Sequence, residues 1–205
     1  MKKYTVEDIK GFEKNEEGWI MCPAGDYTEI KSFPEGCSFG EDCRFGDNCR
    51  FGEWCHFGAE CGFGEWCSFG AECRFGERCS FGAECGFGEW CSFGAECGFG
   101  ERCRFGKRCS FGENCRFGAE CRFEGGHIAA PGYPVLTFSG FGSANRTTYA
   151  FNCKDGIVIR CGCFSGSLEE FREKVRERHG NTPFAFEYLA VADLIERRFS
   201  REEKA

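Results

Sequence analysis

The apolar positions of residues 33–123 recur with a strict period of six. Phe opens each of fifteen hexads, a Cys stands four residues after each Phe, and Phe123 begins an incomplete sixteenth hexad. An even period suits β-strands and does not fit the 3.6-residue period of a helix. In Cys-x-Phe, the Cys and Phe side chains point to one face and x points to the other. We therefore expect short strands joined by Gly-x-x corners, in which Gly would adopt the positive φ of a tight turn.

This pattern, as in Phe81-Gly82-Ala83-Glu84-Cys85, resembles the hexapeptide repeats of left-handed parallel β-helices. The resemblance covers residues 33–123 and implies that three hexads form one coil of 18 residues, hence about five coils. The array departs from that family because its large residue is always Phe, where the family uses an aliphatic residue. Pentapeptide-repeat solenoids are the nearest alternative, but no five-residue register fits. Inward-facing Phe and Cys would then stack in columns, and both ends would need caps.

An 18-residue coil also determines which exposed residues stack. Glu and Ala alternate after much of the Gly column, so a corner reads Glu41, Ala59, Glu77, Ala95, Glu113. This order keeps like charges apart, although gene duplication would also produce it. The outward positions of the middle coils are mostly Ser and Gly, which would let a partner approach closely.

We divide the chain into four parts and expect a mainly β protein with a small C-terminal α+β domain. Residues 1–32 form an N-terminal cap, 33–123 the β-helix, 124–134 a linker and 135–205 the second domain. In the cap, Thr5 and Asp8 predict a capped short helix, followed by strands at 19–22 and 27–30.

The second domain should contain three strands followed by two helices. The strands are predicted at 135–138, 147–152 and 157–163, with Asp155-Gly156 as a hairpin turn. Ser167 and Glu170 form a capping-box pattern for the first helix, which Gly180 ends. Pro183 starts the second helix, whose apolar face would contain Phe184, Tyr188, Leu189, Ala192 and Ile195. This half resembles uncharacterised proteins of phages and mobile elements.

The cysteine content and the net charge limit the chemistry and the partners that we expect for the chain. The 19 Cys are an odd number, and those of the array lack the two-to-four-residue gaps of paired zinc ligands. We expect buried, reduced thiols in a cytoplasmic protein, with disulfides between coils as the alternative. The chain begins without an apolar signal segment, and no apolar run is long enough to span a membrane. The net charge of −7 argues against a nucleic-acid partner.

Catalytic chemistry has little support in the sequence. Many hexapeptide-type β-helix proteins are acyltransferases and some are carbonic anhydrases, but this chain has only His56, His127 and His179. Neither His56 nor His127 has an evident partner that would tune it as a base. Cys153, Cys161 and Cys163 could bind metal or carry redox chemistry, and we favour buried core thiols. We expect no cofactor, no metal and no enzymatic activity.

Two sets of exposed residues are candidates for binding. Exposed Trp is a common interface anchor, and Arg recognises phosphate through its planar fork. The Trp residues are Trp54, Trp66 and Trp90, and the basic residues near the end of the array are Arg102, Arg104, Lys107, Arg108, Arg116 and Arg122.

We interpret the chain as a non-enzymatic binding protein. Its rigid β-helix would engage a protein partner through the flat Ser/Gly faces and the C-terminal domain, as a phage or mobile-element protein that blocks a host factor. The family resemblance implies a homo-oligomer, a trimer or a dimer. The alternative is a binder of small anions or nucleotides, either a sequestering protein or an acyltransferase relative, that uses the basic end and subunit clefts. A third hypothesis, an acidic surface that mimics nucleic acid, is weakened by the mixture of Arg and Glu.

Overall fold

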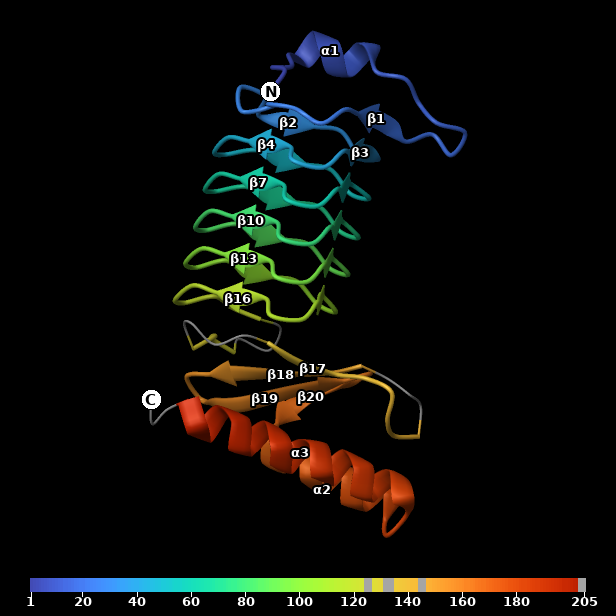
Figure 1. The fold of residues 1–205 in the computed structure, drawn as a ribbon, viewed down its shortest axis with the longest axis vertical. Coiled ribbons are helices and arrows are strands. Elements are labelled where there is room, and N and C mark those ends of the chain that lie inside the picture. The colour runs from blue at the N-terminus through green and yellow to red at the C-terminus, as the bar shows by residue number, and fades with distance from the viewer. Residues whose placement is uncertain (124–126, 131–134, 144–146, 203–205) are drawn as a thin grey trace. The chain divides into compact units, whose positions relative to one another are not determined.

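The hexads form a parallel β-solenoid of about five coils (Figure 1). The structure is a computed structural model and describes residues 1–123, 127–130, 135–143 and 147–202. It divides into two units, Met1–Gly132 and Tyr133–Ala205, which we describe separately. Most of the predicted linker, including Pro131 and Pro134, lies outside the described residues.

Three parallel sheets form the sides of the solenoid, in the orders β1-β3-β6-β9-β12-β15, β16-β13-β10-β7-β4 and β14-β11-β8-β5-β2. Most strands contain only an outward residue and its Phe, as the period of six predicts. Their bounds are β1 Ile20–Cys22, β2 Ser32–Phe33, β3 Cys37–Phe39, β4 Arg44–Phe45, β5 Arg50–Phe51, β6 His56–Phe57, β7 Gly62–Phe63, β8 Ser68–Phe69, β9 Arg74–Phe75, β10 Ser80–Phe81, β11 Gly86–Phe87, β12 Ser92–Phe93, β13 Gly98–Phe99, β14 Arg104–Phe105, β15 Ser110–Phe111 and β16 Arg116–Phe117.

The register confirms the 18-residue coil. Ser80 pairs with Gly98 on one side and Gly62 on the other, each 18 residues away. The outward columns and the alternating Glu/Ala corners are therefore stacked as the sequence predicts. The handedness implied by the family resemblance stays a prediction.

The interior of the solenoid consists of Phe and Cys columns. Phe75 stacks on Phe93 of the next coil with ring centroids 4.9 Å apart and planes at 4°, and meets Phe81 edge-on at 5.0 Å and 85°. Both geometries are favourable for aromatic rings. The same two contacts repeat along the array, where every Phe and Cys is buried. Phe suits this interior because one ring can stack along its column and pack edge-on against the neighbouring columns.

The prediction that Gly supplies the positive φ of the corner is wrong. The left-handed residue is the fourth of the hexad, for example Trp54 at φ 59° and Glu84 at φ 58°. Gly is needed one position after Phe because the coils approach each other there. A Cβ on Gly82 would lie 2.6 Å from the carbonyl carbon of Gly64 in the preceding coil.

Backbone hydrogen bonds hold these corners together. The N–H of Trp54 donates to the carbonyl of Ala71 in the next coil at 3.0 Å, and the N–H of Trp90 donates to Lys107 at 2.9 Å. A left-handed conformation costs an L-residue about 1–2 kcal/mol. The intercoil hydrogen bonds offset that cost and satisfy backbone groups that the turn would otherwise leave unpaired.

Only part of the N-terminal cap forms the elements that the sequence predicts. Helix α1 (Val6–Gly11) has the predicted capping box between Thr5 and Asp8, and β1 continues a side of the solenoid. The strand predicted at 27–30 is wrong, because Thr28 and Glu29 form a turn. Tyr27 is instead a buried plug whose ring stacks on Phe45 at 5.5 Å.

The second unit is an antiparallel sheet with two helices. The sheet order is β17 (Leu136–Phe138), β18 (Thr148–Cys153), β19 (Gly156–Cys161) and β20 (Phe164–Ser167). Strand β20 was not predicted, because the third predicted strand turns at Gly162, which has φ 63°.

The two helices of this unit begin as predicted. Helix α2 (Leu168–His179) has the predicted capping box and ends at Gly180, and α3 (Pro183–Glu202) follows. The prediction that Phe184 belongs to the apolar face of α3 is wrong, because Phe184 is exposed and Ala185 is buried.

We predict opposite effects from two Ala substitutions four residues apart. Gly82→Ala should destabilise the solenoid because its Cβ would meet the backbone of Gly64, whereas a Cβ on Gly86 meets nothing within 4 Å. Gly86→Ala should be neutral or stabilising by about 0.4–1 kcal/mol through the unfolded chain. Urea denaturation followed by circular dichroism measures both. Equal stability of the two variants would contradict the close approach at Gly82.

A second prediction concerns the aromatic columns. Phe93→Ala removes a buried ring from the middle of the stack and should lower the free energy of unfolding by about 3–5 kcal/mol. Ser80→Thr changes an outward residue and is the control, with little expected effect. A Phe93→Ala protein that unfolds at the same urea concentration as the parent would show that the ring is not part of the core.

Candidate functional site

The three exposed Trp residues of the array border one side of the solenoid. Trp54 and Trp90 lie in the corner that follows β5 and β11, and Trp66 lies in the corner that precedes β8. These strands belong to the sheet β14-β11-β8-β5-β2, which we call the Trp-bordered sheet. Each corner touches two sheets, but this is the one sheet that all three Trp residues share.

Most of the predicted basic residues also gather at one end of the Trp-bordered sheet. Arg104 is the outward residue of β14, and Arg122 forms a parallel bridge with it on the next rung. Arg102 precedes β14, and Lys107 and Arg108 occupy the corner that follows it. Arg116 is not part of this group, because it lies in β16 of a different sheet. The structure thus brings together eight of the nine predicted site residues.

Two contacts orient these side chains. The Arg108 guanidinium lies over the Trp90 ring, 4.5 Å from its centroid, in a cation–π contact. The Arg102 guanidinium lies 3.3 Å from the Glu84 carboxylate in the same corner column. Arg108 and Trp90 therefore present a flat aromatic surface next to a positive charge.

The N-terminal cap leaves a hollow at the other end of the same Trp corner. Trp54 and Trp19 both line it, together with Lys14 and Glu35. Trp19 and Lys14 are not recognisable as site residues from the sequence. Their positions in the cap gave no periodic signal, and only the fold places them next to Trp54.

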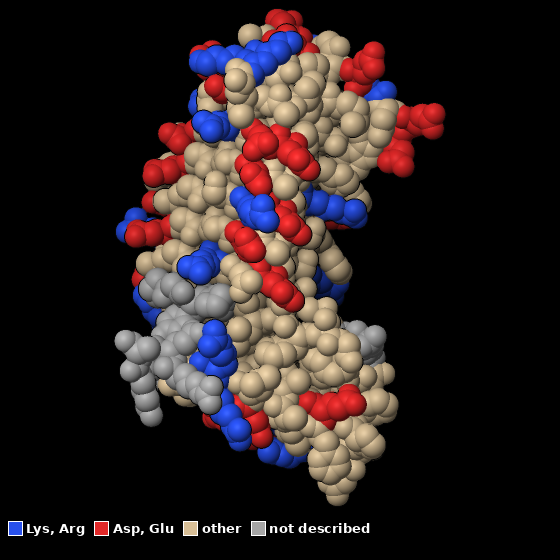
Figure 2. Space-filling view, in the orientation of Figure 1, with Lys and Arg blue, Asp and Glu red and all other residues tan. Residues whose placement is uncertain are grey.

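The corner columns carry both signs of charge. Figure 2 shows Asp and Glu side chains running down the solenoid with Lys and Arg between them. In one corner Arg78 lies between Glu60 and Glu96, at 3.1 Å and 3.4 Å. These side chains are more than half exposed, so each pair contributes about 0–1 kcal/mol. The charges therefore shape the surface potential more than they stabilise the fold.

The thiols of the array are free and buried, as predicted. From Cys61 to Cys121 each thiol donates to the carbonyl oxygen of a Gly in the preceding coil, as when Cys91 Sγ donates to Gly70 at 3.4 Å. The neighbouring thiols of the column, Cys109 and Cys73, and burial together raise the pKa of Cys91. The shift is not the same for every thiol, because hydrogen bonds with Cys61 and Cys97 lower the pKa of Cys79 to about 4. Burial is what all the array thiols share, and it keeps them from metal ions and from reagents.

Among the other candidate residues, His56 and Cys153 are packed in the structure, whereas Cys161 and Cys163 are partly or fully exposed. His56 stacks on Trp19 with ring centroids 4.0 Å apart, and burial lowers its pKa. It serves the packing of the cap. The interpretation of Cys161 and Cys163 as buried core thiols is wrong, because Cys161 is half-buried and Cys163 is exposed in the β19–β20 turn. Cys153 is buried, and desolvation raises its pKa to about 12.

Comparison with known families gives one match. The model of an RNA-binding, Nab2-type zinc finger matches residues 31–46, 42–58, 54–76, 66–82, 72–88, 79–100, 90–106 and 103–123. This match contradicts our expectation that nucleic acid is not a partner, which rested on the net charge alone. It supports a binding protein. The searches of curated proteins and of solved structures found no match.

The residues of the array do not fit a zinc ion. A structural zinc site needs four Cys or His ligands converging at about 2.0–2.3 Å. The described parts of the chain contain no group of three or more His, Cys, Asp or Glu residues that could hold a metal ion. The thiols point into the columns and donate to carbonyl groups, and the one His of the array stacks on Trp19. The array therefore matches the family model without its metal geometry.

No helix in the described ranges combines the length and the apolar character needed to cross a membrane.

We predict that the fold is independent of metal and that its thiols differ in reactivity. Treatment with a chelator should leave the circular dichroism spectrum and the melting temperature unchanged, whereas a zinc finger unfolds without its metal. Under native conditions, exposed Cys163 should react first with a thiol reagent, and the array should react after denaturation. Loss of the β-sheet circular dichroism spectrum on chelation would contradict a metal-independent fold. Detection of fewer than 19 thiols after denaturation without reductant would contradict free cysteines.

Proposed function

We propose that the Trp-bordered sheet binds single-stranded RNA without zinc. The observation that carries the proposal is the convergence of three exposed Trp residues and five basic residues on one sheet and its two corners. Sequence-tolerant binding of single strands uses aromatic side chains for base stacking and a positive track for the backbone. The match to an RNA-binding family supports the same class of ligand.

The spacing of the aromatic residues suits several bases. Trp54 and Trp90 are 36 residues apart, which is two coils or about 10 Å along the corner. Arg108 extends the same column beyond Trp90, and the hollow lined by Trp54 and Trp19 extends it at the opposite end. The corner thus offers a series of flat surfaces. The basic end of the sheet would bind the phosphates.

The acidic residues of the corners set the expected affinity. Glu72 lies between Trp54 and Trp90 in the same column, and the array from residue 33 to 123 contains 15 acidic and 10 basic residues. Repulsion from these carboxylates makes the binding weak and salt-dependent, and confines the phosphates to the Arg-rich end. The free thiols suit a reducing compartment, so we place this function in the cytoplasm.

We predict that RNA affinity depends on the Trp-bordered sheet and not on total charge. Fluorescence anisotropy of a labelled single strand of roughly ten nucleotides measures the binding. Trp54→Ala and Trp90→Ala should each weaken it by about 1–3 kcal/mol, the usual contribution of one stacked base. Arg104→Gln/Arg122→Gln should reduce the salt dependence by about two phosphate contacts. Glu72→Gln should strengthen binding because it removes a carboxylate from the stacking column.

Matched controls separate this site from the rest of the solenoid. Arg74→Gln removes an exposed Arg from β9, and Arg116→Gln removes one from β16, both on other sheets. Neither should change the affinity by more than about twofold. Equal losses in all Arg variants would indicate non-specific attraction, and no saturable binding by the parent protein would reject RNA as the ligand. If RNA is rejected in this way, a protein that contacts the same Trp residues would remain as the alternative partner.

A further inference from the structure

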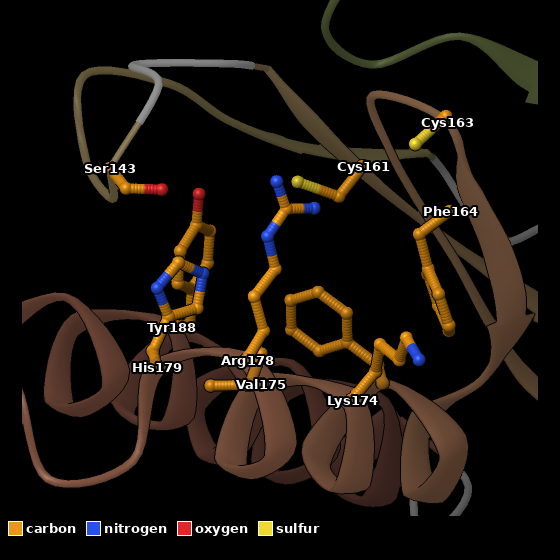
Figure 3. A pocket seen from close by; sticks show the side chains of 10 residues that line it. Ser143, Cys161, Cys163, Phe164, Lys174, Val175, Arg178, His179 and Tyr188 are labelled. Carbon is orange, nitrogen blue, oxygen red and sulfur yellow. The ribbon is translucent and has the colours of Figure 1, made fainter.

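A second cluster of chemical groups lies in the unit formed by residues 133–205. A pocket there is lined by residues of α2, α3, the β19–β20 turn and the loop before β18 (Figure 3). Its apolar lining is Phe164, Phe171 and Val175. Of the lining residues, only Cys161 and Cys163 stand out in the sequence as candidates for chemistry, and the pocket itself was not predicted because its lining comes from four separate segments.

Basic side chains from the last turns of α2 form one wall of the pocket. These are Lys174, Arg178 and His179. Lys174 is ion-paired with Glu177 at 2.7 Å, so its charge is partly compensated. The described residues provide no hydrogen bond or ion pair to the Arg178 guanidinium. Arg178 is therefore the cation that a bound anion would neutralise.

Polar groups of the pocket face this cation. Figure 3 shows Arg178 and Tyr188 pointing from the helices toward the side of the pocket where Cys161 and Ser143 lie. The Tyr188 ring stacks on His179 with centroids 5.5 Å apart, and its side chain is buried against Phe171. Packing therefore fixes the Tyr188 hydroxyl, a hydrogen-bond donor, on the same wall as the basic residues.

We propose that this pocket binds a small organic anion with an apolar, ring-sized body. The guanidinium of Arg178 would pair with a carboxylate, sulfonate or phosphate group, which its planar donors recognise well. The body of the ligand would pack on Phe164, Phe171 and Val175. The thiols of Cys161 and Cys163 lie at the same pocket and would be covered by the ligand. This site is separate from the Trp-bordered sheet and does not depend on RNA binding.

The test uses the full chain and the fluorescent anion 8-anilinonaphthalene-1-sulfonate as the probe. Saturable binding to the parent protein should weaken about tenfold in Arg178→Gln, which corresponds to loss of one charge-assisted pair. A neutral probe of the same shape, N-phenyl-1-naphthylamine, should bind with similar affinity to parent and variant. Inorganic phosphate alone should compete poorly, because it lacks the apolar body.

Arg176→Gln is the matched control. Arg176 is an exposed basic residue in the last turn of the same helix and does not line the pocket. It interacts with the helix dipole as Arg178 does, so a general effect on α2 would appear in both variants. A change of less than twofold in Arg176→Gln supports the site, and equal losses in the two variants reject it.

A second measurement needs no variant. Saturating probe should slow the alkylation of Cys163 and Cys161 by iodoacetamide in the parent protein, as located by peptide mass spectrometry. The neutral probe should protect the thiols less at the same concentration, because it lacks the pairing with Arg178. If neither thiol is protected by the anion while its fluorescence shows saturable binding, the probe binds elsewhere and the proposal is wrong.

Discussion

The close approach of successive coils at the Gly corners is the constraint on which the solenoid depends. Strands of neighbouring coils can pair only if the backbones meet at β-sheet spacing all around the coil, including the corners. At Gly82 that spacing leaves no room for a Cβ against Gly64. The corner is compatible with the Phe columns because the same spacing, about 4.8 Å, brings one aromatic ring onto the next. Backbone and core therefore impose one common period.

This constraint also explains why the corner positions accept many residue types. Once Gly has provided the close approach, the next two residues point away from the core and face few packing demands. The fourth position must accept a left-handed backbone, yet Trp, Glu, Arg and Asn all occupy it. Intercoil hydrogen bonds such as Trp90 to Lys107 compensate the conformational cost. The corners can consequently hold functional residues, as at Trp54 and Arg108, without loss of the scaffold.

The solenoid could be predicted from the sequence because every hexad repeats the same pattern of residue types. The inward Phe and Cys and the helix caps at Thr5 and Ser167 follow from spacing and residue type, whereas the coil length, and with it the outward columns, came from the family resemblance. The sequence could not show whether Gly is needed for the close approach of the coils or for the positive φ of a turn, since both requirements favour Gly. The turn at Thr28 and the strand β20 were missed because they depend on tertiary packing: Tyr27 is buried against Phe45, and Gly162 reverses the chain after Cys161. Net charge misled the assessment of partners because it averages over sides that differ.

The matched family is a zinc finger, whereas the described residues of this array form no metal site, and the difference has a physical cause. A zinc finger gains its folding free energy from ligands that converge on one ion. Here the Cys side chains are buried in the interior of the solenoid, and the thiols from Cys61 to Cys121 donate to Gly carbonyls of the preceding coil. Convergence of several thiols on one ion would require them to leave their columns, with loss of the aromatic stack. Thus the interactions that make the solenoid stable also exclude the metal, and any RNA affinity must come from the outer surface. On that surface the Trp-bordered sheet concentrates aromatic and basic residues, whereas the outward positions of β3 to β16 on the other two sides hold isolated Arg residues among Ser, Gly and His56.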